Sequence, residues 1–166
     1  MLILGIDPGS STTGFGLVDG RGTDLRYVHH AEVKVAAGKT LAGKLACLYQ
    51  ATLDLLDEYQ PEMAAVEGIF YGRNVRSMLV LGQARGAALV AVANRGLEIA
   101  EYPPTVVKQS VVGYGRAAKE QVQQMVKVLL NRRRIGGEHA ADALAVAICH
   151  HQHRQLRSWQ QAAGRQ

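Results

Sequence analysis

The apolar positions of the first third of the chain form short runs separated by turn residues. Residues 2–6 and 15–18 are apolar runs on either side of a segment rich in Asp, Pro, Gly, Ser and Thr, which predicts a β-hairpin. Residues 25–35 mostly alternate between apolar and polar side chains and predict a third strand. Three strands joined by short turns are expected to pair antiparallel.

The rest of the chain alternates between helical spacing and short apolar runs. Helices are expected over residues 40–59, 75–95, 117–130 and 138–150, with Thr40 as the cap of the first and a short helical turn after Pro103-Pro104. Two more strands are expected at 63–67 and 98–102. The order of elements predicts one α/β domain, a five-stranded mixed sheet flanked by helices, over residues 1–151. Residues 152–166 are polar and basic and are expected to form a flexible tail.

The predicted helix at 75–95 is apolar around nearly its whole circumference. A helix with this pattern is buried on more than one side. We therefore expect one face to pack on the sheet and another to lie in an interface between two subunits.

The composition is that of a folded protein without a membrane anchor. The chain has 166 residues, of which 48% are hydrophobic and 20% charged. The sequence has no apolar run near 18 residues, so we expect no transmembrane helix. Leu2 enters a predicted strand without a preceding basic region, so we expect no signal peptide. The two cysteines, Cys47 and Cys149, are isolated in apolar helical patterns, which favours reduced thiols and a cytoplasmic location.

Charge is distributed unevenly along the chain. The first 68 residues carry a net charge of −4 and the remainder carries +9. An acidic first part beside a basic second part indicates a carboxylate-lined site next to a surface that binds a polyanion. The alternative is a solvated basic face without a partner.

Four potential metal ligands occur where the predicted elements begin or end. Asp7 and Glu67 each end a predicted strand, and His139 and Asp142 share one face of the first turn of the last helix. If the two strands are parallel neighbours, their carboxylates meet at one edge of the sheet. Three carboxylates and one imidazole suit Mg²⁺ or Mn²⁺. Taken singly, Asp7 could instead stabilise a turn, and His139 could cap the helix or contact phosphate.

Several further residues are candidates for contact with nucleic acid. The loop at 68–74 places two aromatic residues among glycines and arginines, which is typical of a surface that stacks on bases. Phe70 could instead pack into the core. A glycine-rich basic loop and a run of three arginines suggest phosphate contacts. The candidates are Phe70, Tyr71, Arg73, Arg76, Lys108, Arg116, Lys119, Arg132 and Arg133.

These residues together resemble the RuvC family of Holliday-junction resolvases, which belongs to the RNase H-like superfamily. The resemblance spans roughly residues 2–151. It rests on Gly5-Ile6-Asp7-Pro8-Gly9, Val66-Glu67, Leu81-Gly82-Gln83-Ala84-Arg85-Gly86, Val107-Lys108-Gln109, Val112-Gly113 and Ala140-Ala141-Asp142-Ala143-Leu144-Ala145.

The resemblance implies a homodimer that makes two symmetric cuts in a four-way DNA junction, leaving 5′ phosphate and 3′ hydroxyl ends. It implies two Mg²⁺ or Mn²⁺ ions in each site and the RuvA–RuvB branch-migration complex as a partner. Asp7, Glu67 and Asp142 match family metal ligands, and His139 stands where an Asp is common. Lys108 and Lys119 match basic residues near the scissile phosphate, and Phe70 matches an aromatic that contacts a base.

Two other functions fit parts of this pattern. The turn that follows Asp7 also occurs in actin-like ATPases, although the chain is too short for their duplicated domains. A junction-binding module without catalysis would be expected to have lost its carboxylates, whereas here only the position of His139 departs from the family set.

Overall fold

The computed structural model describes residues 1–34, 38, 40–68 and 74–163. The elements follow one another as β1 (Leu2–Asp7), β2 (Thr12–Arg21), β3 (Asp24–Lys34), α1 (Leu41–Tyr59), β4 (Met63–Glu67), α2 (Val75–Asn94), β5 (Ile99–Tyr102), α3 (Pro104–Val112), α4 (Lys119–Leu129) and α5 (Glu138–Ala163).

The strands form one mixed sheet in the order β3-β2-β1-β4-β5. The pairs β1–β2 and β2–β3 are antiparallel, whereas β4 runs parallel to both β1 and β5. The predicted fold class is therefore confirmed, and the parallel pairing of β1 with β4 meets the condition under which Asp7 and Glu67 come together. The second strand is longer than predicted at both ends, because Thr12 and Thr13 pair with Lys34 and Val33 of β3, and residues 19–21 pair with residues 24–26 of the same strand.

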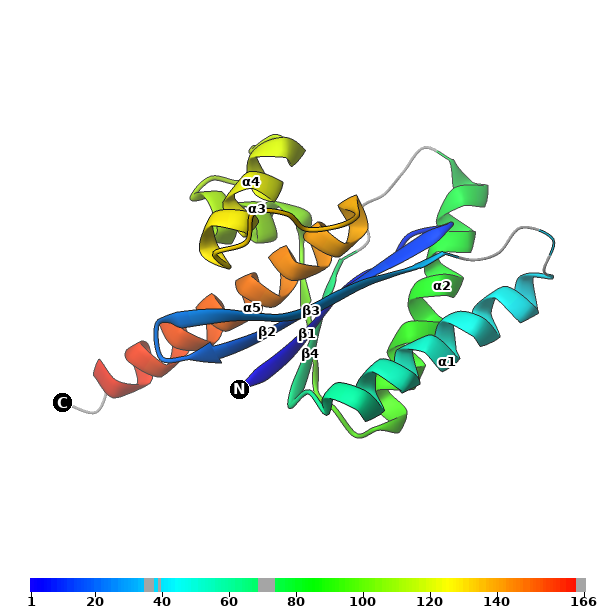
Figure 1. The fold of residues 1–166 in the computed structure, drawn as a ribbon, viewed down its shortest axis with the longest axis horizontal. Helices are drawn as coiled ribbons and strands as arrows, with labels where there is room; N and C mark the ends of the chain where they lie inside the picture. Colours follow the sequence, from blue (N-terminus) through cyan, green and yellow to red (C-terminus); the bar gives the residue numbers. More distant parts are fainter. Residues whose placement is uncertain (35–37, 39, 69–73, 164–166) are drawn as a thin grey trace.

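Helices cover both faces of the sheet (Figure 1). One hydrophobic core lies between the sheet and α3, α4 and α5, and a second lies between the sheet and α1 and α2. The predicted cap of the first helix is confirmed, since Thr40 Oγ1 accepts a hydrogen bond of 3.2 Å from the backbone N–H of Gly43.

Glycines in the two central strands let α5 lie directly against the sheet. A Cβ atom on Gly5 would stand 2.0 Å from the backbone oxygen of Ala143, and one on Gly14 would stand 2.0 Å from that of His139. Any side chain at either position would push the helix away. The start of α5 is therefore fixed beside the end of β1.

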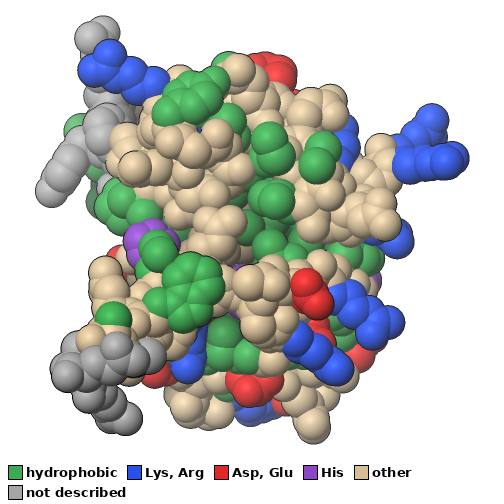
Figure 2. All heavy atoms as spheres, turned by 90° about the vertical axis from the view of Figure 1, so that its left-hand side faces the viewer, with side chains coloured by type: hydrophobic (Ala, Val, Ile, Leu, Met, Phe, Trp, Pro, Cys, Tyr) green, Lys and Arg blue, Asp and Glu red, His purple; other side chains and the backbone are tan. Residues whose placement is uncertain are grey.

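The last helix continues well past the end near His150 that the sequence predicts. Most residues after His150 are good helix formers, and the next glycine is Gly164. The expected domain boundary after residue 151 stays a prediction, and the helix continues across it. Figure 2 shows this end of the molecule, where hydrophobic and basic side chains lie side by side. Leu156 and Trp159 are large exposed side chains of this part of α5.

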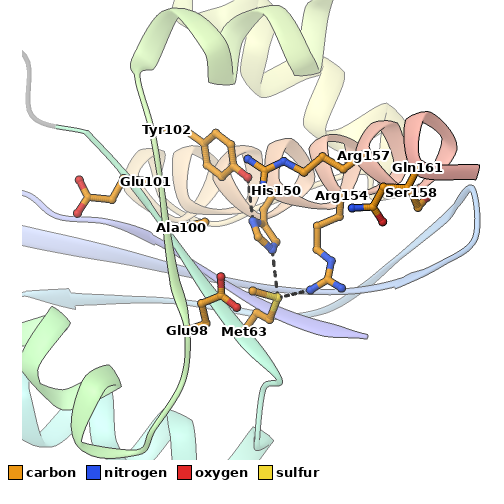
Figure 3. Close-up of a pocket in the computed structure, with 10 residues that line it drawn as sticks. All are labelled: Met63, Glu98, Ala100, Glu101, Tyr102, His150, Arg154, Arg157, Ser158 and Gln161. Atoms are coloured by element: carbon orange, nitrogen blue, oxygen red, sulfur yellow. Dashed lines mark hydrogen bonds between the residues drawn. The ribbon is translucent and has the colours of Figure 1, made fainter. Parts of the chain in front are cut away.

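Side-chain contacts attach the extended part of α5 to the sheet around a cavity of about 440 Å³ (Figure 3). The hydroxyl of Tyr102 and Nδ1 of His150 are 2.9 Å apart, and Arg154 donates to the sulfur of Met63 over 2.6 Å. Burial, followed by the positive charge of Arg154, lowers the pKa of His150 to about 4. The imidazole is therefore neutral at physiological pH.

Helix α2 is covered on one side only. Its buried positions face α1 and the sheet, whereas Val75, Leu79 and Val90 have more than half of their surface exposed. By length and mean hydropathy, which is 1.3, it is the one helix of the described chain that could cross a membrane. In the fold it packs instead against α1.

Candidate functional site

Asp7, the last residue of β1, is a buried carboxylate with an imidazole as its partner. Its Oδ2 lies 2.7 Å from Nδ1 of His139, at the start of α5. Burial and the nearby charge of Asp142 raise the pKa of Asp7 to about 6, although the hydrogen bond to His139 opposes this rise. The carboxyl group is thus held in an environment that disfavours its negative charge.

Glu67, the last residue of β4, stands at the same edge of the sheet. The parallel pairing sets Ile6 beside Val66, so that the two strands end next to each other. Burial, and then the charges of Asp7 and Asp142, raise the pKa of Glu67 to about 7. The three carboxylates therefore influence one another electrostatically, as expected for side chains that converge on one site.

Asp142 lies one turn after His139 in α5 and is paired with a lysine. The Nζ atom of Lys119, at the first position of α4, is 3.1 Å from Oδ2 of Asp142 and 3.0 Å from Oε2 of Glu138. Burial lowers the pKa of Lys119, but its hydrogen bonds to Glu138 and Asp142 outweigh this effect and the net shift is upward. Lys119 remains a cation at the mouth of the site.

A cavity of about 190 Å³ opens between these groups. Two carboxylates and two ammonium groups line it, from Glu67, Asp142, Lys108 and Lys119. The remaining wall is apolar and is formed by Pro104, Val107, Val122 and Ala145. A cavity of this kind offers acidic oxygens and phosphate-binding cations within one small space.

The donor set fits a divalent cation. Asp7, Glu67 and Asp142 offer the oxygen ligands that Mg²⁺ and Mn²⁺ prefer, and His139 adds an imidazole nitrogen. A cation would also offset the burial and the mutual repulsion that raise the pKa values of Asp7 and Glu67. As placed, no three Asp, Glu, His or Cys side chains among the described residues enclose an ion. Asp7 and Asp142 are directed instead to His139 and Lys119.

The predicted nucleic-acid contacts are spread over several elements. Lys108 and Lys119 face the cavity, whereas Arg76, Arg116, Arg132 and Arg133 are exposed outside it. The guanidinium of Arg132 lies 4.4 Å from the centre of the Tyr27 ring, a cation–π contact that holds it against β3. Phe70, Tyr71 and Arg73 lie outside the residues that the structure describes.

Three charged residues take part in the site without having been predicted to do so. Glu138 forms an ion pair with Lys119, as Asp142 does. Arg85, which is buried in α2, donates to the backbone oxygen of Glu67 over 3.4 Å and pairs with Glu101. Glu32 of β3 accepts from the backbone of α5. Only Arg85 carried a sequence signal, because it lies within one of the segments shared with resolvases.

The mixed sheet and the carboxylates at the ends of β1 and β4 and the start of α5 together define an RNase H-like nuclease. The family described as crossover junction endodeoxyribonuclease RuvC matches residues 3–150. The chain belongs to the RuvC family.

Relatives and solved structures agree with this assignment. The RuvC protein of Geotalea uraniireducens is 49% identical over 150 residues, which cover 90% of this chain and 88% of the relative. That of Syntrophotalea carbinolica is 50% identical, over 90% of this chain and 93% of the relative. The structure of Thermus thermophilus RuvC in complex with Holliday junction substrate is 34% identical and superimposes with a TM-score of 0.89, covering 94% and 96% of the two chains.

Proposed function

We propose that this chain is a Holliday-junction resolvase that hydrolyses one phosphodiester bond in each of two symmetric DNA strands. The convergence of Asp7, Glu67 and Asp142 beside two lysines carries the proposal. The likeness to an RuvC protein in complex with junction DNA supports the substrate class. The nuclease domain would comprise residues 1–151, and residues 152–166 would not take part in cleavage.

In the proposed mechanism, Asp7, Glu67, His139 and Asp142 hold the metal. Bound Mg²⁺ or Mn²⁺, two ions in each site, would lower the pKa of an attacking water and stabilise the leaving 3′ oxygen. Lys108 would hold the scissile phosphate against the carboxylates. Lys119 would exchange its contact with Asp142 for the phosphate, where it neutralises charge that grows in the transition state. The products would carry 5′ phosphate and 3′ hydroxyl ends.

The exposed face of α2 supports a homodimer. Val75, Leu79 and Val90 project from it, and between them Gly82 and Gly86 have open space where a side chain would stand. Small residues between large ones let a second helix approach closely. A twofold dimer would present two cutting sites to the two strands of a junction. The same face accounts for the high hydropathy of α2 without a membrane.

The exposed arginines would hold the DNA arms by their phosphates, and a base would stack on Phe70, which follows Glu67 by three positions in the sequence. The family resemblance supports RuvA–RuvB as a partner complex, and chromosomal DNA as the substrate supports a cytoplasmic location. Pull-down of RuvA–RuvB with the purified dimer, in the presence and absence of junction DNA, tests the partner.

The test of the function is a nicking assay on a synthetic four-way junction. We expect paired, symmetric nicks with Mg²⁺ or Mn²⁺, none with EDTA, and much less cleavage of linear duplex of the same sequence. Tight binding of the junction without cleavage under any divalent metal would indicate a binding module. Hydrolysis of ATP and stabilisation by it, without nicking, would indicate an actin-like ATPase.

A further inference from the structure

The first turn of α5 is held by a carboxylate from the edge strand β3. Oε1 of Glu32 accepts hydrogen bonds from the backbone N–H groups of His139, at 3.0 Å, and Ala140, at 3.3 Å. The first N–H groups of a helix have no partner within the helix, and a negative charge there is favourable. Glu32 thus caps a helix that begins more than a hundred residues later in the chain.

A second residue of β3 holds the segment just before the helix. Nε2 of His30 accepts from the backbone N–H of Gly136 at 3.0 Å, and its Nδ1 is 2.7 Å from the hydroxyl of Tyr27. His30 and Glu32 are two positions apart in the strand, so both point to the same face. The connection between α4 and α5 is therefore held at two points, one before and one after Gly137.

Gly137 makes the contact with Glu32 possible. Its φ of +85° is in the left-handed region that favours glycine, and a Cβ atom there would stand 2.1 Å from Oε1 of Glu32. The glycine therefore lets the chain turn into α5 while the carboxylate reaches the helix.

The backbone that Glu32 holds carries two of the proposed metal ligands. The imidazole of His139 lies against Asp7, and Asp142 follows one turn later at the cavity. Glu32 itself does not line the cavity. Its contribution to the site passes through the position of the helix.

We propose that Glu32 is a positioning residue for cleavage, assisted by His30: it fixes the first turn of α5 so that His139 and Asp142 face Asp7 and Glu67. This inference rests on the proposed nuclease function. A neutral acceptor of the same length can make the same hydrogen bonds, whereas a shorter side chain cannot reach them.

The test compares Glu32→Gln, Glu32→Asp and Glu32→Ala in the full-length protein. Loss of a group that orients metal ligands typically lowers activity or metal affinity by about tenfold to a hundredfold. We expect such a loss in kcat for Glu32→Ala and Glu32→Asp, with junction Kd within about twofold of wild type, and recovery of most of the activity in Glu32→Gln. Glu98→Ala, which removes an exposed carboxylate of another segment, serves as the control.

Two measurements without cleavage separate positioning from general stability. Hydrogen exchange at the amides of His139 and Ala140 should be faster in Glu32→Ala than in Glu32→Gln, while exchange in β1 and β4 is unchanged. The Mn²⁺ concentration that gives half of the thermal stabilisation should rise in Glu32→Ala and Glu32→Asp but not in Glu32→Gln. Wild-type kcat and unchanged exchange in Glu32→Ala would overturn the inference. A wild-type protein that does not nick junctions would overturn the proposed function, and the exchange experiment would still test the contact.

Discussion

Nδ1 of His139 lies 2.7 Å from Oδ2 of Asp7, although 132 positions separate the two residues in the sequence. The contact joins the end of the first strand to the start of the last helix. It gives a buried carboxylate a hydrogen-bond donor when the imidazole carries its proton on Nδ1. We propose that both side chains are also metal ligands.

Asp7→Asn should abolish nicking and leave junction binding nearly unchanged. Asparagine retains the size of the side chain but provides neither the charge nor the second carboxylate oxygen that a metal requires. Gel-shift affinity and nicking are measured side by side on one preparation. Loss of binding and folding together with nicking would show that Asp7 serves the structure alone.

Deprotonation of Asp7 and Glu67 should lower the free energy of unfolding of the metal-free protein as the pH rises from about 4 to about 8. Their folded-state pKa values, about 6 and about 7, lie above the ordinary values of 3.8 and 4.5. The fold therefore favours the protonated forms, and this contribution is lost as the pH rises through the folded pKa values.

Removing one of these charges should reverse part of that loss. One unit of pKa corresponds to roughly 1.4 kcal/mol, so Asp7→Asn should gain about 1–2 kcal/mol at pH 8 in EDTA after loss of the His139 contact is allowed for. Denaturant unfolding of wild type and variant at pH 5 and pH 8 measures the difference. Equal pH dependence of the two proteins would contradict the assigned environment of Asp7.

His139→Asp should increase activity with Mg²⁺ relative to Mn²⁺. Imidazole suits transition metals better than Mg²⁺, whereas a carboxylate adds a charged oxygen ligand. The ratio of the two activities, measured at saturating concentration of each metal, is the readout, and His153→Asp at an unrelated position of α5 is the control. An unchanged ratio would mean that His139 is not a ligand.

Arg133→Ala should weaken binding of junctions of every sequence alike and flatten the dependence of binding on salt. A phosphate contact releases counterions, and loss of one contact lowers the slope of log K against log salt by about 1. Adding Arg132→Ala should weaken binding and lower the slope further, because a second phosphate contact is lost. An effect confined to particular cleavage sequences would assign these side chains to base recognition instead.

Leu79→Asp should separate the proposed dimer into monomers. The side chain is 63% exposed, so the substitution should change the stability of the monomer little. In the dimer it would bury a charge in the α2 interface. Sedimentation of wild type and variant gives the oligomeric state, and Val128→Asp, on the exposed face of α4, is a matched control. A monomeric wild-type protein would exclude the interface.

The sequence predicted the carboxylate site from local signals. Asp7 and Glu67 could be found because each ends a buried strand, and the parallel pairing of β1 and β4 then requires them to meet. Lys119 was found through the family resemblance, but its ion pair with Asp142 was not. Glu32 carried no signal in the sequence. Its partner His139 is 107 positions away, and no local pattern predicts that strand β3 and the start of α5 lie side by side. The predicted end of α5 is too early, since Arg154 contacts Met63 and His153 contacts Tyr102 beyond the apolar pattern of the helix.

The position of α5 directly on Gly5 and Gly14 has a consequence for the order of events during synthesis. Asp7 and Glu67 leave the ribosome before Asp142 and the helix that covers the sheet, because they precede them in the sequence. Contacts so distant in sequence form late and depend on the whole domain. A partly made chain would therefore lack His139 and Asp142, half of the proposed metal ligands, and we expect it not to cut DNA.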